Sequence, residues 1–338
     1  MQGLGLPSLG AFLVIGVWIL IAFIAFTTQF YVFLPWVHSV HTGFINVLVA
    51  YICLTYYISV SRSPGTPALS PGGDKDENLK MCRKCDRIKP PRCHHCKTCQ
   101  TCVLRMDHHC PFLNNCLGYR NHGVFICFLL SVDVCVGYIF WELLLRAYDI
   151  YLQRNEPSYL GPSTVEIVFT ILNILLCFGI LISVGVLTVH QLKNLAINMT
   201  TIEEWEAEHH ETLVDEGRAD HVEFPYDIGI YENLKAVLGP CPWLWLWPWA
   251  TAVGDGFSFP TNGFSDAGWP PPTSDYKKYV YSPAGVVPAI EIESEYLSRG
   301  DEEQDDSEDS WENLNGETLG DFGVDVDTEQ DTWGSLVE

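Results

Sequence analysis

The chain has 338 residues, of which 48% are hydrophobic and 18% are charged, and its formal net charge is −23. Most of the negative charge lies late in the chain, since 32 of the 42 Asp and Glu residues follow residue 200. Residues 1–61 contain no Asp, Glu, Lys or Arg, which excludes an ordinary soluble domain for this region and is too long for a signal peptide.

Four apolar segments predict transmembrane helices. The first two are residues 10–35 and 41–61, each long enough to cross about 30 Å of hydrocarbon. The third, Val124–Leu145, is apolar apart from Asp133 and Glu142, and the fourth, Ile167–Val189, carries no charge. We therefore expect an all-α polytopic membrane protein, because only fully hydrogen-bonded helices or closed barrels are stable in lipid. Asp133 is expected to face the bundle interior or a polar cavity.

The basic residues orient these helices. Of the 19 Lys and Arg residues, 11 lie between Arg62 and Arg120. The positive-inside rule places a loop of this kind in the cytosol. With four spans, both termini are then cytosolic.

Composition divides the rest of the chain. We expect a flexible Pro/Gly/Ser-rich linker at residues 62–77 and a cysteine-rich module at 78–122. The third and fourth helices follow at 123–192. A cytosolic C-terminal region at 193–250 then leads to a loop-rich to disordered acidic tail at 251–338. Residues 301–338 hold 15 acids and no Lys or Arg, which is typical of a disordered tail. Within them SWENLNGETLGDFGV has an alternative interpretation as a docking motif.

Residues 241–249 read CPWLWLWPW, with four Trp residues alternating with smaller residues or Pro. Two interpretations stand side by side. One is an amphipathic segment in the membrane interface, a depth that Trp favours. The other is an aromatic cluster packed against the helices.

Eight of the 13 cysteines lie in residues 78–122. A disulfide framework is not expected in the reducing cytosol, so thiolates and imidazoles at this spacing indicate zinc. Two tetrahedral sites need eight ligands, and the module offers more: Cys82, Cys85, Cys93, His94, His95, Cys96, Cys99, Cys102, His108, His109, Cys110 and Cys116. Some of these side chains are therefore left over, and a spare thiol beside a histidine is a candidate nucleophile.

The order of motifs resembles the DHHC cysteine-rich domain of membrane protein S-acyltransferases, also called palmitoyltransferases. The resemblance rests on Cys82-x-x-Cys85, Pro90-Pro91-Arg92, His95-Cys96-x-x-Cys99-x-x-Cys102 and Asp107-His108-His109-Cys110-Pro111, followed by Asn115-Cys116. After the fourth span, Thr200-Thr201-Ile202-Glu203 is similar to the family's TTxE motif, and Tyr226–Gly239 to its C-terminal motif, with Asn233 in the Asn position. The short N-terminus and acidic tail are similar to fungal members of the endoplasmic reticulum type.

This resemblance implies a role for each ligand. One structural zinc would be held by Cys82, Cys85, His95 and Cys102, and the other by Cys96, Cys99, His109 and Cys116. Cys110 would be the nucleophile that takes the acyl group from acyl-CoA, such as palmitoyl-CoA, and passes it to substrate cysteines in a two-step ping-pong reaction. His108 would be the base, and Asp107 would fix its tautomer.

The acyl chain is expected in a cavity among the helices, with Cys110 at its cytosolic mouth. Phe112 stands where the family usually has Trp and would contact the chain near the thioester. Arg92 and Arg105, with Lys97 and Arg120, are candidates for meeting the CoA phosphates.

Two other functions are weighed against acyl transfer. A membrane-anchored zinc adaptor would explain the metal ligands and the tail, but it leaves Asp107, His108 and Cys110 without a role. A transporter would rest on Asp133 alone. Partners of an acyltransferase would be the bilayer, acyl-CoA and membrane-associated proteins with cytosolic cysteines, with no nucleic acid. Its expected location is an endomembrane, the endoplasmic reticulum or the Golgi.

Overall fold

The structure is a computed structural model that describes residues 9–34, 39–67, 81–217, 219–249, 252–263, 269, 279–282, 285–288, 313 and 317–325. The chain forms two compact units. The helical unit comprises Met1–Gly65, Cys110–Ala196 and Leu234–Val253. The cysteine-rich unit comprises Thr66–His109, Ile197–Asn233 and Gly254–Glu338. Most of the predicted linker and most of the predicted acidic tail lie outside the described residues.

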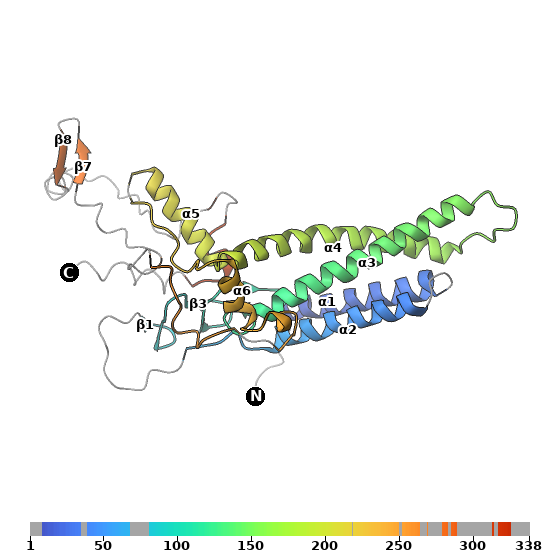
Figure 1. Cartoon of the computed structure of the whole chain (residues 1–338), viewed down its shortest axis with the longest axis horizontal. Helices are drawn as coiled ribbons and strands as arrows, with labels where there is room; N and C mark the ends of the chain where they lie inside the picture. Colours follow the sequence, from blue (N-terminus) through green and yellow to red (C-terminus); the bar gives the residue numbers. More distant parts are fainter. Residues whose placement is uncertain are drawn as a thin grey trace. The chain divides into compact units, whose positions relative to one another are not determined.

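Four long helices build the helical unit (Figure 1). They are α1 (Leu9–Thr27), α2 (Ser39–Ser61), α3 (His122–Gln153) and α4 (Thr164–Ala196), and a π-helix, η1 (Thr28–Phe33), continues α1. All four are long and apolar enough to cross a membrane, so the predicted spans are confirmed. The last two helices extend beyond the predicted spans because hydropathy marks where lipid ends and not where the helix ends.

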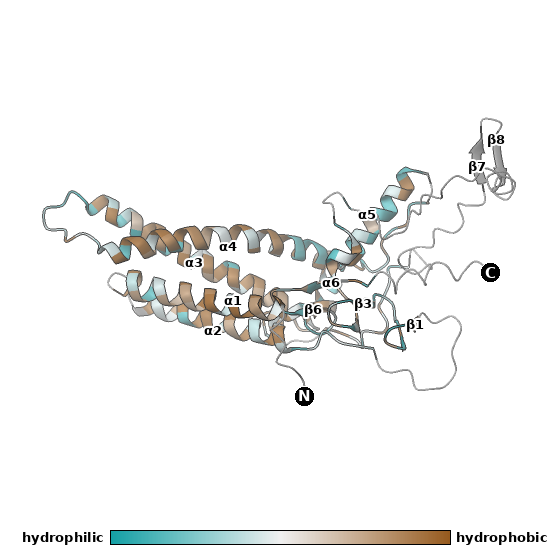
Figure 2. Cartoon of the chain, turned by 180° about the vertical axis from the view of Figure 1, so that it is seen from behind, coloured by the Kyte–Doolittle hydropathy of each residue, from teal (hydrophilic) through white to brown (hydrophobic). Residues whose placement is uncertain are grey.

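Exposed apolar side chains cover the outside of these helices. Ile15, Phe26, Phe178 and Val186 are each more than half exposed, and Figure 2 shows the hydrophobic colour along all four helices. In water such a surface would be unstable, whereas lipid tails cover it without cost. The chain is therefore built as an integral membrane protein.

Some polar groups in the membrane-spanning helices are paired between helices. Thr188 of α4 donates a hydrogen bond to Oδ2 of Asp133 on α3 at 2.6 Å. Further along α3, Nδ1 of His41 lies 2.6 Å from the hydroxyl of Tyr138 and 3.1 Å from Oε1 of Glu142. Asp133 thus points to the neighbouring helix α4, as expected. The hydroxyl of Thr188 gives one of its carboxylate oxygens a hydrogen bond that lipid could not supply.

Short hairpins make up the cysteine-rich module. Strands β1 (Met81–Cys82) and β2 (Arg87–Ile88) pair, as do β3 (His94–Cys96) and β4 (Thr101–Val103), and then β5 (His108–Cys110) and β6 (Asn115–Leu117). In the first two, the residue after the CxxC pair has positive φ, at Asp86 and Gln100, and its N–H donates to the carbonyl of the first cysteine. This tight turn brings both thiols of each pair to one side.

The remaining elements are α5 (Thr201–Asp215), α6 (Ile230–Leu238), the 3₁₀ helices η2 (Pro242–Leu244) and η5 (Leu319–Phe322), and the hairpin β7 (Tyr279–Ser282) and β8 (Gly285–Pro288). In the CPWLWLWPW segment, Trp245 donates to the carbonyl of Gly239 and packs on the helical unit, whereas Trp243 is 93% exposed. Trp247 and Trp249 are also exposed. The packed-cluster interpretation is therefore confirmed for Trp245. For the three exposed Trp residues, the membrane-interface interpretation stays a prediction.

Candidate active site and metal clusters

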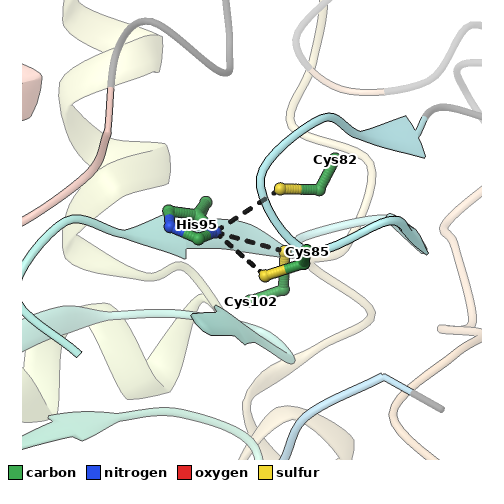
Figure 3. Close-up of side chains that lie close together, drawn as sticks. All are labelled: Cys82, Cys85, His95 and Cys102. Atoms are coloured by element: carbon green, nitrogen blue, oxygen red, sulfur yellow. Dashed lines mark hydrogen bonds between the residues drawn. The ribbon is translucent and has the colours of Figure 1, made fainter. Parts of the chain in front are cut away.

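Four side chains of the cysteine-rich unit converge on one point (Figure 3). Nδ1 of His95 lies 3.4 Å from the sulfur of Cys82, 3.2 Å from that of Cys85 and 3.8 Å from that of Cys102. Zn–S bonds of about 2.3 Å and Zn–N bonds of about 2.0 Å at a tetrahedral angle place N and S about 3.5 Å apart. The donor set and its spacing therefore fit a zinc ion.

A second cluster has the same composition. Its members are Cys96, Cys99, His109 and Cys116. Nδ1 of His109 lies 3.7 Å from the sulfur of Cys96 and 3.4 Å from that of Cys99. Both clusters are the sets that the family resemblance implied. The ligands interleave along the chain because each hairpin turns one CxxC pair toward a histidine from a neighbouring hairpin.

Asp107 and His108 form a hydrogen-bonded pair next to the second cluster. Nδ1 of His108 lies 2.7 Å from Oδ2 of Asp107, whose side chain is fully buried. Thr201, the first residue of α5, donates its backbone N–H at 3.0 Å and its hydroxyl at 3.1 Å to the same carboxylate. A carboxylate held in this way keeps the imidazole proton on Nδ1 and leaves Nε2 as the basic nitrogen.

Cys110 follows two residues later, in the helical unit. It is 7% exposed and packs in a cluster with Tyr56 and Phe125. It also lines a cavity of about 380 Å³ whose walls come from α1, α2, α3 and α4. On α3 the lining residues run from Phe125 to Ile139, which corresponds to about 21 Å of helix.

Phe112 lies in the same wall, and its backbone carbonyl accepts a hydrogen bond of 2.8 Å from the hydroxyl of Tyr56. Phe112 is 55% exposed, and because it lines the cavity, its predicted contact with the acyl chain is consistent with the structure. The other lining residues are almost all apolar, which suits a hydrocarbon chain.

Arg92 and Arg105 are buried in the cysteine-rich unit. The guanidinium of Arg92 donates hydrogen bonds to both carboxylate oxygens of Glu203, from Nε at 2.5 Å and from Nη2 at 2.7 Å. The side chains of Arg92 and Glu203 are each 2% exposed. Arg105 donates to Oδ1 of Asn198 at 2.9 Å. These contacts give both guanidinium groups partners inside the protein, so the predicted contacts with CoA phosphates stay a prediction that this burial does not favour.

The carboxyl of Glu203 also closes the N-terminus of α5. Burial alone raises its pKa, but the charge of Arg92 and its hydrogen bonds outweigh burial and lower the pKa below the ordinary value. The carboxylate of Glu203 accepts a hydrogen bond from the backbone N–H of Thr200. In return, the hydroxyl of Thr200 accepts one from the backbone N–H of Glu203. This capping box presents Thr201 to Asp107.

Asn198 was not predicted to belong to this network, and Tyr226 was predicted only as the first residue of the C-terminal motif. Asn198 has φ of 54°, joins both buried arginines and donates to the carbonyl of Tyr226 at 3.0 Å. Tyr226 stacks under the guanidinium of Arg92, 4.4 Å from its ring centre. Asn233 is fully buried and holds the turn before α6 through Asp227 and Ile228. No local signal distinguishes Asn198, because its partners lie about a hundred residues away.

Comparison with known proteins gives consistent matches. Residues 75–208 match the family model described as DHHC palmitoyltransferase. The chain is 34% identical over 309 residues to palmitoyltransferase PFA4 of Yarrowia lipolytica, covering 82% of this chain and 88% of that protein. It is 31% identical to palmitoyltransferase pfa4 of Aspergillus fumigatus, covering 92% of each. It is also 32% identical to probable protein S-acyltransferase 16 of Arabidopsis thaliana, over 63% of this chain and 78% of that one.

Proposed function

The chain belongs to the DHHC family of palmitoyltransferases and is a protein S-palmitoyltransferase, and we propose that the acyl group travels through a thioester on Cys110. One observation carries this proposal. Cys110 lines an apolar cavity, and the hydrogen-bonded Asp107–His108 pair stands two residues before it. The base therefore stands two residues before the nucleophile in the chain, and the nucleophile itself lines a cavity suited to an acyl chain.

In the first step, Nε2 of His108 takes the proton from the thiol of Cys110. The sulfur of Cys110 attacks the carbonyl carbon of the acyl-CoA thioester, the C–S bond to CoA breaks, and the proton passes from His108 to the departing CoA sulfur. In the second step, His108 takes the proton of a substrate cysteine, whose sulfur attacks the acyl-Cys110 carbonyl. The sulfur of Cys110 leaves and recovers the proton. A free thiol has a pKa of about 8.5, so a base is needed at cytosolic pH.

Asp107 supports both steps without exchanging protons. Its buried carboxylate holds the Nδ1–H of His108 and stabilises the imidazolium that forms in each step. The N–H and hydroxyl of Thr201 in turn hold the carboxylate. The TTxE motif is therefore proposed to act as the support of the catalytic base.

The two clusters are proposed to hold zinc as a structural ion. Each offers three thiolates and one imidazole, a closed tetrahedral set with no position for a reacting group. When bound, zinc would supply cross-links among the hairpins that carry Asp107 and His108. A module with strands of only two or three residues has little other means of holding these side chains in place.

The direct test of the function is transfer of a labelled acyl group from palmitoyl-CoA to the purified protein and then to a cysteine-containing acceptor. We expect label on the enzyme first and on the acceptor second, with stoichiometric release of CoA. A zinc adaptor or a transporter would leave the thioester of palmitoyl-CoA intact. Either result therefore separates acyl transfer from both other functions.

The size of the cavity predicts which acyl-chain lengths the enzyme prefers. Val136 of α3 lines the cavity and packs in another core cluster than Cys110, so Val136→Trp should fill the part of the cavity that is distant from Cys110. Loss of room for two methylenes costs about 1.6 kcal/mol, so preference for palmitoyl over a shorter acyl-CoA should fall about fifteenfold. Val134→Trp is the matched control, because Val134 lies on the same helix but is 57% exposed on the outside. Equal selectivity of both variants, measured by competition between acyl-CoAs, would contradict the assignment.

We also propose the orientation and location of the protein. The 11 Lys and Arg residues between Arg62 and Arg120 support a cytosolic cysteine-rich module, and four spans then put both termini in the cytosol. Substrates would be membrane-associated proteins with cytosolic cysteines. An endomembrane is the proposed site, in the endoplasmic reticulum rather than the Golgi.

A further inference from the structure

A short stretch near the end of the chain, Glu317–Asp325, pairs with the metal-binding strand β3. Val324 forms an antiparallel bridge with Cys96. The N–H of Asp325 donates to the carbonyl of His95 at 2.8 Å, and the N–H of Lys97 donates to the carbonyl of Gly323 at 2.9 Å. We call Glu317–Asp325 the C-terminal strap. It extends a two-stranded hairpin that carries ligands of both clusters. For these residues the docking interpretation agrees with the structure, and a solvated tail does not.

Apolar burial and α5 hold the strap. Leu319, Phe322 and Val324 are each less than 9% exposed. Nε1 of Trp205, a buried residue of α5, donates to the carbonyl of Glu317 at 2.9 Å. Burial of three such side chains stabilises a docked segment by several kcal/mol before its ordering cost, so the strap is built to stay on the module.

Gly323 allows the close approach. Its φ is 87°, and a Cβ at this position would lie 2.6 Å from Cβ of His109, a ligand of the second cluster. Any other residue would have to push this ligand or lift the strap. The glycine is therefore required by contact with the metal module as well as by its own backbone conformation.

Asp325 faces the first cluster. His95 directs Nδ1 at the three sulfurs, and within the described part of the chain its other nitrogen, Nε2, is buried without a hydrogen-bond partner. Oδ2 of Asp325 lies 4.0 Å from that nitrogen and 2.5 Å from Nζ of Lys84. A histidine that binds metal through one nitrogen carries a proton on the other, and a carboxylate beside that proton, here at ion-pair rather than hydrogen-bond distance, favours this ring orientation and strengthens the ligand.

We infer that the C-terminal strap is an intramolecular clamp on the zinc module, and that Asp325 is a positioning residue for the zinc ligand His95. The inference rests on the proposed zinc sites, although not on the chemistry of Cys110. It gives part of the acidic tail a defined role in holding the hairpins that carry the catalytic base.

Zinc release tests the inference in the full-length protein. Zinc content is measured by elemental analysis, and release is followed after addition of excess chelator. The protein is expected to hold two zinc ions per chain. In Asp325→Ala, one of the two should leave about tenfold faster or more, because His95 belongs to only one cluster. Gly323→Val should accelerate release of both ions, since it displaces His109 and the strap together.

Three variants complete the test. Asp327→Ala removes the same charge two residues away and should release zinc at the wild-type rate. Asp325→Asn keeps an acceptor oxygen, so it should release zinc more slowly than Asp325→Ala. Lys84→Met breaks the ion pair but leaves the carboxylate, and it should also be slower than Asp325→Ala.

The outcomes distinguish an error in the proposed zinc sites from an error in the proposed role of the C-terminal strap. Absence of zinc from the wild-type protein would contradict the proposed metal sites themselves. Two bound zinc ions that leave Asp325→Ala at the wild-type rate would overturn the role of Asp325, and an unchanged rate in Gly323→Val would overturn the clamp. If Lys84→Met matched Asp325→Ala, Asp325 would act through its ion pair and not through His95.

Discussion

Cys110→Ser should lose hydroxylamine-sensitive self-acylation and reduce transfer of palmitate to an acceptor at least a thousandfold, roughly the scale on which removing a catalytic nucleophile acts. The serine hydroxyl is far less acidic than the thiol, so His108 cannot prepare it for attack on a thioester. The variant should still bind two zinc ions, because Cys110 belongs to neither cluster. Labelling with palmitoyl-CoA and elemental analysis of the same sample measure both properties.

Cys93→Ser is the matched control for this experiment. Cys93 is a buried cysteine of the same module that also belongs to neither metal cluster. It should keep both self-acylation and transfer. Persistent thioester labelling of Cys110→Ser would contradict the mechanism, and loss of zinc from this variant would show that Cys110 has a structural role.

Glu203→Gln should lower the free energy of unfolding of the cysteine-rich unit by about 3–5 kcal/mol, which is the usual effect of removing one partner of a buried ion pair. The substitution leaves the guanidinium of Arg92 buried without its counter-charge. It also weakens the capping box that presents Thr201 to Asp107, so acyl transfer should fall as well. Denaturant titration of the detergent-solubilised protein gives the change in stability.

Glu211→Gln is the control, since it removes the same charge from the exposed face of the same helix and should change stability by less than about 0.5 kcal/mol. The pH dependence supplies a second check. The pKa of Glu203 is lowered in the folded protein, so its contribution is complete above the ordinary glutamate value of about 4.3 and is lost as pH falls through the lower folded value. The difference between wild type and Glu203→Gln should therefore shrink in acid, and a constant difference would contradict the ion-pair account.

The membrane helices and the list of metal ligands were predictable from the sequence. Hydropathy is a local property that sums along a segment, so the four spans could be located without knowledge of their neighbours. The spacing of the cysteines and histidines identified twelve candidate ligands, and resemblance to a family selected eight of them and assigned these to two sets that the structure reproduces. Counting alone did not make that assignment, because twelve side chains competed for eight places.

Roles that depend on distant partners were not predictable. Arg92 was expected to meet a phosphate because an arginine in a basic module commonly does, but its carboxylate partner lies 111 residues further along the chain. The ion pair is a product of the packing of α5 against the module, which no local pattern encodes. The same packing places the TTxE threonine on Asp107.

Four membrane spans and a Cys/His-rich module could be recognised from the amino-acid sequence, because hydropathy and ligand spacing act over short distances, and the DHHC resemblance divided the ligands into two clusters. The pairing of Arg92 with Glu203, and the identity of the tail acid that is bound, depend on the tertiary fold and became visible only in the structure. Asp325 is one of 15 acids in residues 301–338, and its composition predicts a solvated charge. Its contact with Lys84 joins residues 241 positions apart, and it forms because Leu319, Phe322 and Val324 bury their side chains nearby.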